Sequence, residues 1–259
     1  MLSTAFFGGV VVLVAVLAAT AGLVVARRLI PLHVRERHTA ATGTIYAAVY
    51  VMFGLSAGFS LFSVWQQFNT ARQTVEDEAA NVEQIHQLAG GFPEPGRGRV
   101  QRSAESYARE VVDEEWPLLE RRRSSPRAGA LLDDLRRGVQ GVEPRTDAQG
   151  ALRTQALAEL DELEEGRVLR LVLVRQGLPF ILWVVLVVGG ALTIAFPFLF
   201  GIDAAWLHAA TVAGLTVLVS LILYVIGVLD YPFGSGVEVQ PDAFERFLRA
   251  IGGNGGGGP

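Results

Sequence analysis

The sequence predicts an all-α polytopic membrane protein: four transmembrane helices, with a helical, water-exposed insert between the second and the third. Three observations support this fold class. The 259 residues are 51% hydrophobic, with a mean hydropathy of +0.36. Charged residues make up 19% of the chain, below the roughly 25% of soluble domains. They are also segregated, because residues 67–176 hold 20 of the 26 acidic and 16 of the 22 basic residues.

Four uncharged stretches flank this charged region, at residues 1–26, 39–71, 176–202 and 204–229. Each is longer than the roughly 20 residues that a helix needs to cross a bilayer. A helix is expected because backbone groups in lipid must be satisfied within the segment. Ala19-Thr20-Ala21 has the small residues of a signal-peptide cleavage site. No basic residue precedes it, however, and the apolar run exceeds the roughly 7–15 residues of a signal core, so we expect a retained helix.

These stretches define the expected organisation of the chain. Helices one and two occupy residues 1–66, and helices three and four occupy 177–229. The water-exposed domain takes 67–176, a turn and short helix take 230–251, and a disordered glycine-rich tail takes 252–259.

Apolar residues at helical spacing continue from Phe68 to Leu88, which predicts that helix two extends out of the membrane before the glycines and prolines of 90–96 end it. Two further helices are expected at 99–116 and 127–138. A last one is expected from about Ala151 straight into helix three, with Pro179 as a tolerated kink. The charged runs 76–78 and 121–123 are interpreted as solvated faces. The acid pairs 133–134 and 164–165 are interpreted as surface ion pairs.

Several functional classes lack support in the sequence. There is no cysteine, and the four histidines are scattered without acids at ligand spacing, so no metal site is expected. Nucleic-acid binding has no positive excess to support it. Neither a phosphate loop nor a nucleophile elbow is present, and we therefore expect no enzyme and no cofactor. At membrane depth the polar side chains are hydroxyls, which disfavours a charge-coupled transporter but not a passive pore.

Helix two carries the richest pattern. Gly54 and Gly58 form a small-xxx-small motif that predicts close helix packing, with the neighbouring aromatic side chains facing lipid or other helices. In a second interpretation, several copies of this helix surround an axis. Leu55, Phe59 and Phe62 would then form a hydrophobic constriction that gates by dewetting. Aromatic edges are electropositive and tolerate anions better than cations.

A turn motif follows helix four: Asp230, Pro232, Phe233 and Gly236. Pro232 is expected to stop the helix. Asp230 is expected to cap the turn or to pair with an arginine of the middle domain, for example Arg72. The glycines permit backbone angles that other residues avoid, so the segment is expected to fold the C-terminal helix back onto the domain.

These motifs resemble the bacterial bestrophin-like family. The resemblance rests on the Phe59–Trp65 end of helix two, on Asn69-Thr-Ala-Arg72-x-x-Val75, on Glu78-Ala-Ala-Asn81 and on the Asp-x-Pro-Phe turn at 230–233. It covers about residues 35–247. Bestrophins are pentameric anion channels whose pore is lined by the second transmembrane helix. The resemblance therefore implies a homo-oligomer in the lipid bilayer that passes small anions. The acidic segments of a calcium clasp are missing.

The alternative function is a non-conducting membrane scaffold whose helical domain binds a partner protein. Location in the cell membrane is expected in either case. Six arginines border the membrane on the face of the middle domain and four on the other, which favours a cytoplasmic domain under the positive-inside rule. The short first loop favours the opposite orientation.

Overall fold

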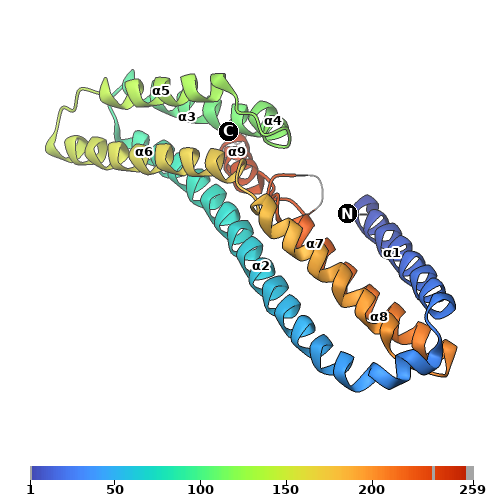
Figure 1. Ribbon diagram of the computed structural model, residues 1–259. Coiled ribbons are helices and arrows are strands. Elements are labelled where there is room, and N and C mark those ends of the chain that lie inside the picture. The colour runs from blue at the N-terminus through green and yellow to red at the C-terminus, as the bar shows by residue number, and fades with distance from the viewer. Residues whose placement is uncertain (1, 235–236, 255–259) are drawn as a thin grey trace. The chain divides into compact units, whose positions relative to one another are not determined.

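The computed structural model describes the backbone of residues 2–234 and 237–254, and the side chains of 6–31, 43–234 and 237–253. Within these residues all regular structure is helical, which confirms the predicted all-α class (Figure 1). Among the described residues, four segments are long and apolar enough to cross a membrane: Phe6–Leu29, Gly43–Gly91, Phe180–Leu199 and Ala205–Leu229. The chain forms two compact units. We call Met1–Gln66 with Gly177–Asp230 the membrane unit, and Gln67–Gln176 with Tyr231–Pro259 the helical domain.

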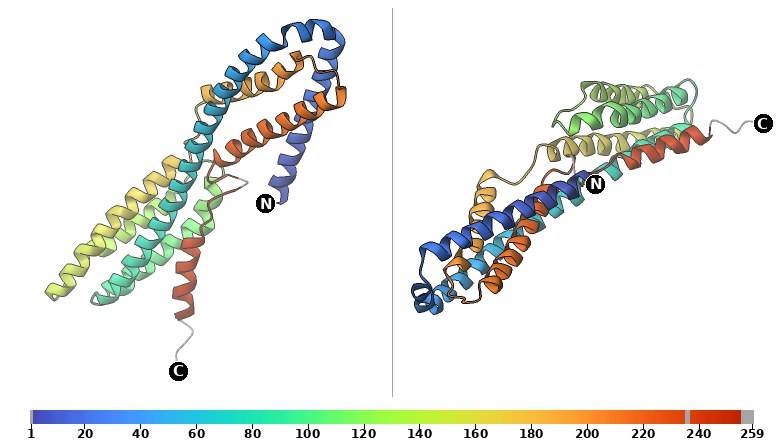
Figure 2. Two further views of the ribbon diagram at one scale, coloured as in Figure 1. Left: turned by 90° about the horizontal axis from the view of Figure 1, so that it is seen from below. Right: turned by 90° about the vertical axis from the view of Figure 1, so that its right-hand side faces the viewer.

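The membrane unit contains α1 (Leu2–Leu29), the first part of α2 (Leu32–Leu88), α7 (Phe180–Ala195) and α8 (Ala205–Leu229). α1 packs along α8 (Figures 1 and 2), where Ala19 and Leu23 meet Val212 in a small buried cluster. Gly8 allows this close approach, because an added Cβ would lie 2.6 Å from Tyr224. Most other side chains of these helices are exposed, as expected of surfaces that face lipid or neighbouring chains.

In its described residues the helical domain comprises the second part of α2 and five further α-helices. These are α3 (Gly96–Glu110), α4 (Trp116–Leu119), α5 (Pro126–Gln140), α6 (Asp147–Leu173) and α9 (Asp242–Asn254). α2 and α6 run antiparallel, with Gln84 bonded to Glu159 and Glu78 bonded to Arg170. α3 packs on α5, and α9 adds Phe244 and Phe247 to the same core. The predicted surface ion pairs are confirmed for two of the four acids, as Arg137 pairs with Asp134 and Arg136 with Glu164. Among the described residues Asp133 and Glu165 form no ion pair.

Local sequence explains where these helices begin. Ser125 caps α5 by accepting from the Ala128 amide, with Pro126 at the first helical position. Thr146 caps α6 by accepting from the Gln149 amide, while Gln149 Oε1 accepts from the Arg145 amide in return. This cap starts α6 at Asp147, earlier than the predicted Ala151.

The predicted continuous helix from the domain into the third membrane segment is wrong. α6 ends at Leu173, and α7 begins only at Phe180. The non-helical stretch therefore runs from Val174 to Pro179, and it is a break rather than a kink. Pro179 lacks an N–H and disfavours helical angles at Leu178, so α7 begins only after it. At the C-terminus, α9 runs to Asn254, three residues beyond the predicted limit of 251, and residues 255–259 lie outside the described residues.

Candidate functional site

One face of α2 is buried within the membrane unit and another is open. Phe53, Ala57, Ser60 and Val64 recur at intervals of four, three and four residues, and all are buried. Phe53 packs against α7, where Gly189 and Gly190 leave room for its ring. This spacing is that of a single helix face, so the side chains between these positions point elsewhere.

The three residues predicted to form a constriction lie together on the open face. Leu55 is 55% exposed, Phe59 is 72% exposed and Phe62 is 58% exposed. They are spaced four and three residues apart, so they form one stripe along the helix. Large exposed apolar side chains in a row mark a surface that contacts lipid or protein.

Gly54 and Gly58, the predicted packing motif, lie beside this stripe. A Cβ added to either glycine would meet no atom within 4 Å. Among the described residues of one chain, therefore, no helix packs on the motif. Its use for helix packing remains a prediction that requires another copy.

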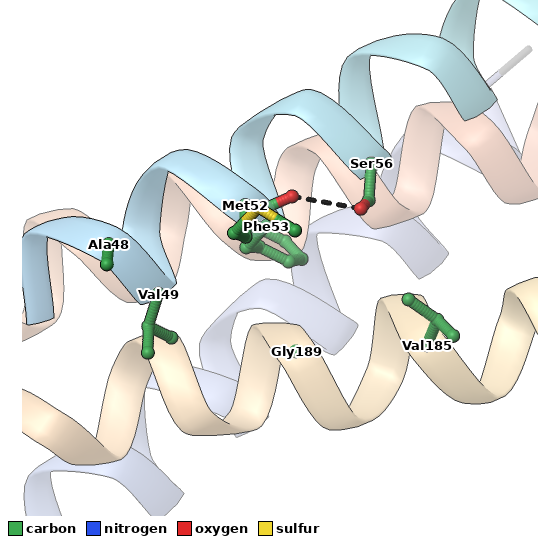
Figure 3. A pocket seen from close by; sticks show the side chains of 7 residues that line it. All are labelled: Ala48, Val49, Met52, Phe53, Ser56, Val185 and Gly189. Carbon is green, nitrogen blue, oxygen red and sulfur yellow. Dashed lines mark hydrogen bonds between the residues drawn. The ribbon is translucent and has the colours of Figure 1, made fainter. Parts of the chain in front are cut away.

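An apolar hollow of about 350 Å³ lies between α2 and α7 (Figure 3). Its walls are Ala48, Val49, Met52, Phe53, Ser56, Val185 and Gly189. The only side-chain hydroxyl among these residues, that of Ser56, donates to the Met52 carbonyl 2.9 Å away and is already satisfied. The hollow therefore offers shape and apolar surface without a free polar side chain.

The turn after α8 is anchored through Asp230. This carboxylate is fully buried and accepts from the Leu178 amide at 2.6 Å and from the Trp183 indole N–H at 3.2 Å. The predicted pairing of Asp230 with an arginine of the middle domain, such as Arg72, is therefore wrong. Its two partners lie at the start of the third membrane segment. One carboxylate thus ties the end of α8 to the start of α7 inside the membrane unit.

The next residues of the motif pack into the helical domain. Phe233 is buried and meets the Trp116 ring edge-on, with the ring centroids 5.7 Å apart. The Pro232 carbonyl accepts from the Val239 amide at 2.8 Å. Both contacts fold the segment before α9 onto the domain. Gly236 lies outside the described residues.

A fully buried ionic network occupies the core of the helical domain. Arg170 of α6 donates to both oxygens of Glu78, at 2.7 and 3.1 Å, and to Glu115 at 2.7 Å. Tyr107 donates its hydroxyl proton to Glu78 at 2.5 Å. The guanidinium of Arg170 also lies 5.6 Å from the Trp116 ring centroid. None of the four linked side chains is exposed.

Glu115 belongs to a single π-helical turn, Val111–Glu115, between α3 and α4. Pro117 follows and has no N–H to donate back, a situation that a widened turn accommodates. Glu115 accepts from Arg170, from Arg167 at 2.7 Å and from the Ser125 amide at 3.0 Å. The carboxylate is therefore surrounded by donors, as a buried charge must be.

The network shifts two pKa values. Burial, and next the charge of Glu78, raise the pKa of Tyr107 well above its ordinary value. Burial alone would lower the pKa of Arg170, but Glu78, Tyr107 and Glu115 outweigh it and raise the pKa. Tyr107 therefore stays neutral and Arg170 charged over the physiological range.

The sequence interpretation missed this network. The charged run 76–78 predicts a solvated face, whereas Glu78 is fully buried. A usable signal was present: Glu78 lies at helical spacing from Ala71, Val75, Val82 and Ile85, which are all buried. Among the described residues no cluster of histidine or acidic side chains could hold a metal ion.

Four membrane-length helices and an interposed helical domain define a polytopic helical membrane protein. A family model described as a bestrophin-like domain matches residues 13–244, and the chain belongs to this family. No curated protein matches this chain.

Solved structures agree in fold. A bacterial bestrophin homologue from Klebsiella pneumoniae with a leucine-to-threonine substitution is 14% identical, and the match covers 95% of this chain and 99% of that one, with a TM-score of 0.71. A variant of the Klebsiella homologue with a tyrosine-to-alanine substitution is 16% identical over 94% and 98% of the two chains, with a TM-score of 0.68. At these identities the likeness concerns the fold.

Proposed function

We propose that copies of this chain assemble around an axis into a passive anion channel in the cell membrane, with α2 lining the pore. The observation that carries the proposal is the open stripe of Leu55, Phe59 and Phe62 on α2 of a bestrophin-like chain. In this arrangement the stripe faces the axis, while the buried face of α2 packs on α7 of its own chain.

The chemistry of the stripe favours a gated anion path. A ring of leucine and phenylalanine side chains excludes water when narrow and conducts when wide. The positive edges of aromatic rings favour anions over cations. Residues 39–71 contain no charged side chain, so no fixed charge in this part of α2 holds a permeating ion.

Flux measurements test the pore. Chloride or iodide influx is measured in liposomes that contain the purified protein, comparing wild type with Phe59→Ala and Phe62→Ala. The matched control is Phe7→Ala, because Phe7 is 65% exposed on α1 and lies outside the proposed pore. We expect the two α2 variants to conduct more anion than wild type and the control to match it.

Thiol chemistry gives a second readout, since the chain contains no cysteine. A negatively charged methanethiosulfonate reagent should block flux through Phe62→Cys and leave Phe7→Cys unaffected. A folded oligomer whose flux responds to neither the α2 substitutions nor the reagent would refute the pore and favour the scaffold.

For orientation, the excess of arginines beside the membrane supports a cytoplasmic helical domain. Arg145 is exposed in the loop before α6, so Arg145→Cys reports the side on which the domain lies. An impermeant maleimide should label it in inverted vesicles. Labelling in right-side-out cells would reverse the orientation.

A further inference from the structure

The membrane end of the helical domain is fixed by chain connectivity. The chain passes between the two units at Gln66–Gln67, at Gln176–Gly177 and at Asp230–Tyr231. Tyr231 therefore follows directly on the buried Asp230 that anchors α8 to α7. Tyrosine and tryptophan are enriched where proteins cross the membrane surface.

An arginine-rich turn lies against this tyrosine. The guanidinium of Arg122 is 4.3 Å from the Tyr231 ring centroid. Because Tyr231 is one residue, about 3.8 Å, from the last residue of the membrane unit, Arg122 lies beside the point where the chain enters the membrane.

The turn has a backbone geometry that glycine usually supplies. The Arg123 amide donates to the Leu118 carbonyl and the Arg122 amide to the Leu119 carbonyl, which is the Schellman pattern at a helix end. Arg122 occupies its left-handed position, with φ of 57°. Glycine is favoured there because it has no Cβ, so an arginine at this position is unfavourable for folding and calls for another explanation.

The turn is also strongly basic. Arg121, Arg122 and Arg123 are all exposed, and Glu120 is the only acidic residue between Leu119 and Ser125. No carboxylate of the described residues lies within ion-pair distance of the three arginines, whereas Arg127 pairs with Glu110 at 3.3 Å. Arg72 and Arg175, five residues past Gln67 and two before Gly177, are exposed as well.

We propose that the Arg121–Arg123 turn binds the headgroup phosphate of an anionic glycerophospholipid at the membrane surface. Guanidinium groups bind phosphate oxygens through paired hydrogen bonds, and anionic leaflets attract basic segments next to the membrane. Tyr231 holds Arg122 by stacking, and Arg121 and Arg123 complete the positive surface. This inference is independent of the proposed channel, since it requires only that α8 crosses the membrane.

The test is lipid-dependent stabilisation of the whole protein in dodecyl maltoside. The thermal midpoint is followed while phosphatidylglycerol, phosphatidylcholine or sodium phosphate is added. We expect phosphatidylglycerol alone to raise the midpoint at low concentration. Its half-effective concentration should rise about fivefold for each arginine removed, the effect expected of one juxtamembrane arginine.

Arg122→Gly is the decisive variant, because glycine suits the turn. It should keep or raise the midpoint without lipid and still respond more weakly to phosphatidylglycerol. Arg121→Gln with Arg123→Gln should weaken the response further, and Arg121→Lys with Arg123→Lys should restore most of it. The control is Arg102→Gln with Arg145→Gln, since both arginines are exposed. Arg102 follows Gln101, which donates to the His86 carbonyl of α2, 19 residues beyond the start of the helical domain at Gln67. Arg145 precedes α6, whose 27 residues place it about 40 Å from the membrane end.

Three outcomes would overturn the proposal. Arg122→Gly and the double glutamine variant could both respond to phosphatidylglycerol as wild type does. Phosphatidylcholine could stabilise wild type equally well, which would remove the role of headgroup charge. Free phosphate could reproduce the shift at the same concentration, which would make the turn a site for small anions.

Discussion

Replacing Arg170 by methionine tests the buried network directly. The substitution removes three hydrogen bonds and one charge, and leaves Glu78 with Tyr107 as its only bonded partner among those described. Glu115 retains Arg167 and the Ser125 amide. Breaking a buried ion pair on one side costs about 3–5 kcal/mol, because the other charge stays buried without its partner.

The assay is thermal unfolding in detergent, followed by circular dichroism. For a chain of 259 residues, each kcal/mol of lost stability lowers the thermal midpoint by about 2–4 °C. The midpoint of Arg170→Met should therefore fall by about 6–20 °C. The matched control is Arg136→Met, which also removes an arginine bonded to two carboxylates, Asp161 and Glu164, in a partly exposed setting. Exposed pairs contribute about 1 kcal/mol or less each, so the loss of two should lower its midpoint by no more than about 8 °C.

A second substitution separates charge from packing. Glu78→Gln in the Arg170→Met background removes the orphaned charge and keeps an acceptor for Tyr107. It should recover part of the lost stability, because the cost of a broken buried pair comes from the charge that stays buried. Equal midpoints for Arg170→Met and Arg136→Met, or no recovery by Glu78→Gln, would refute the account of the network as a buried and mutually dependent set of charges.

Four further substitutions have defined outcomes. Tyr107→Phe should lower the free energy of unfolding by about 1.5–3 kcal/mol, the value of a hydrogen bond to a charged group. Because the folded-state pKa of Tyr107 is raised, the contribution of this residue to stability is complete below about pH 10 and falls as the pH rises above that value. In denaturant titrations, Tyr107→Phe should therefore lose less stability between pH 9 and 11 than wild type does. Asp230→Asn should lower the thermal midpoint by the equivalent of about 1–3 kcal/mol, because Leu178 and Trp183 donate to different carboxylate oxygens and the substitution replaces one of these with an NH2 that cannot accept. A midpoint equal to wild type would exclude this role. Gly190→Leu should unfold the membrane unit at a lower temperature, because even an added Cβ there lies 3.1 Å from Val219. Gly58→Leu should leave the stability of the monomer unchanged, because a Cβ there meets open space, and should reduce the oligomeric fraction measured by light scattering.

The membrane helices were predictable from the sequence because length and hydropathy alone decide whether a segment can span a bilayer. The helix ends were less predictable. Thr146 and Gln149 cap α6 through side-chain hydrogen bonds, and such a pair is visible in the sequence when sought. The break between α6 and α7 depends in addition on Asp230, which lies 52 residues away from Leu178 and holds its amide.

The ionic network could not be predicted from the sequence, for a different reason. Hydropathy assigns charged residues to the surface, and Glu78 follows two exposed acids, Glu76 and Asp77. Among the described residues its side chain is bonded by Arg170, 92 residues further along the chain, and by Tyr107 from a third helix. No local pattern reports such a distant partner, although helical spacing from buried apolar residues shows that Glu78 points inward.

The open face of α2 could contact either lipid tails or the apolar surface of another protein chain, because both are apolar. Glycine within a helix costs about 1 kcal/mol relative to alanine. Within the described chain no contact offsets this cost at Gly54 or Gly58, because a Cβ at either position would meet open space. Lipid would accommodate an alanine equally well. Only a closely approaching helix benefits from a missing Cβ, as in small-xxx-small packing between membrane helices. The occurrence of these glycines beside the exposed Phe59 and Phe62, within nine residues of α2, therefore favours another copy of the chain over lipid at this face.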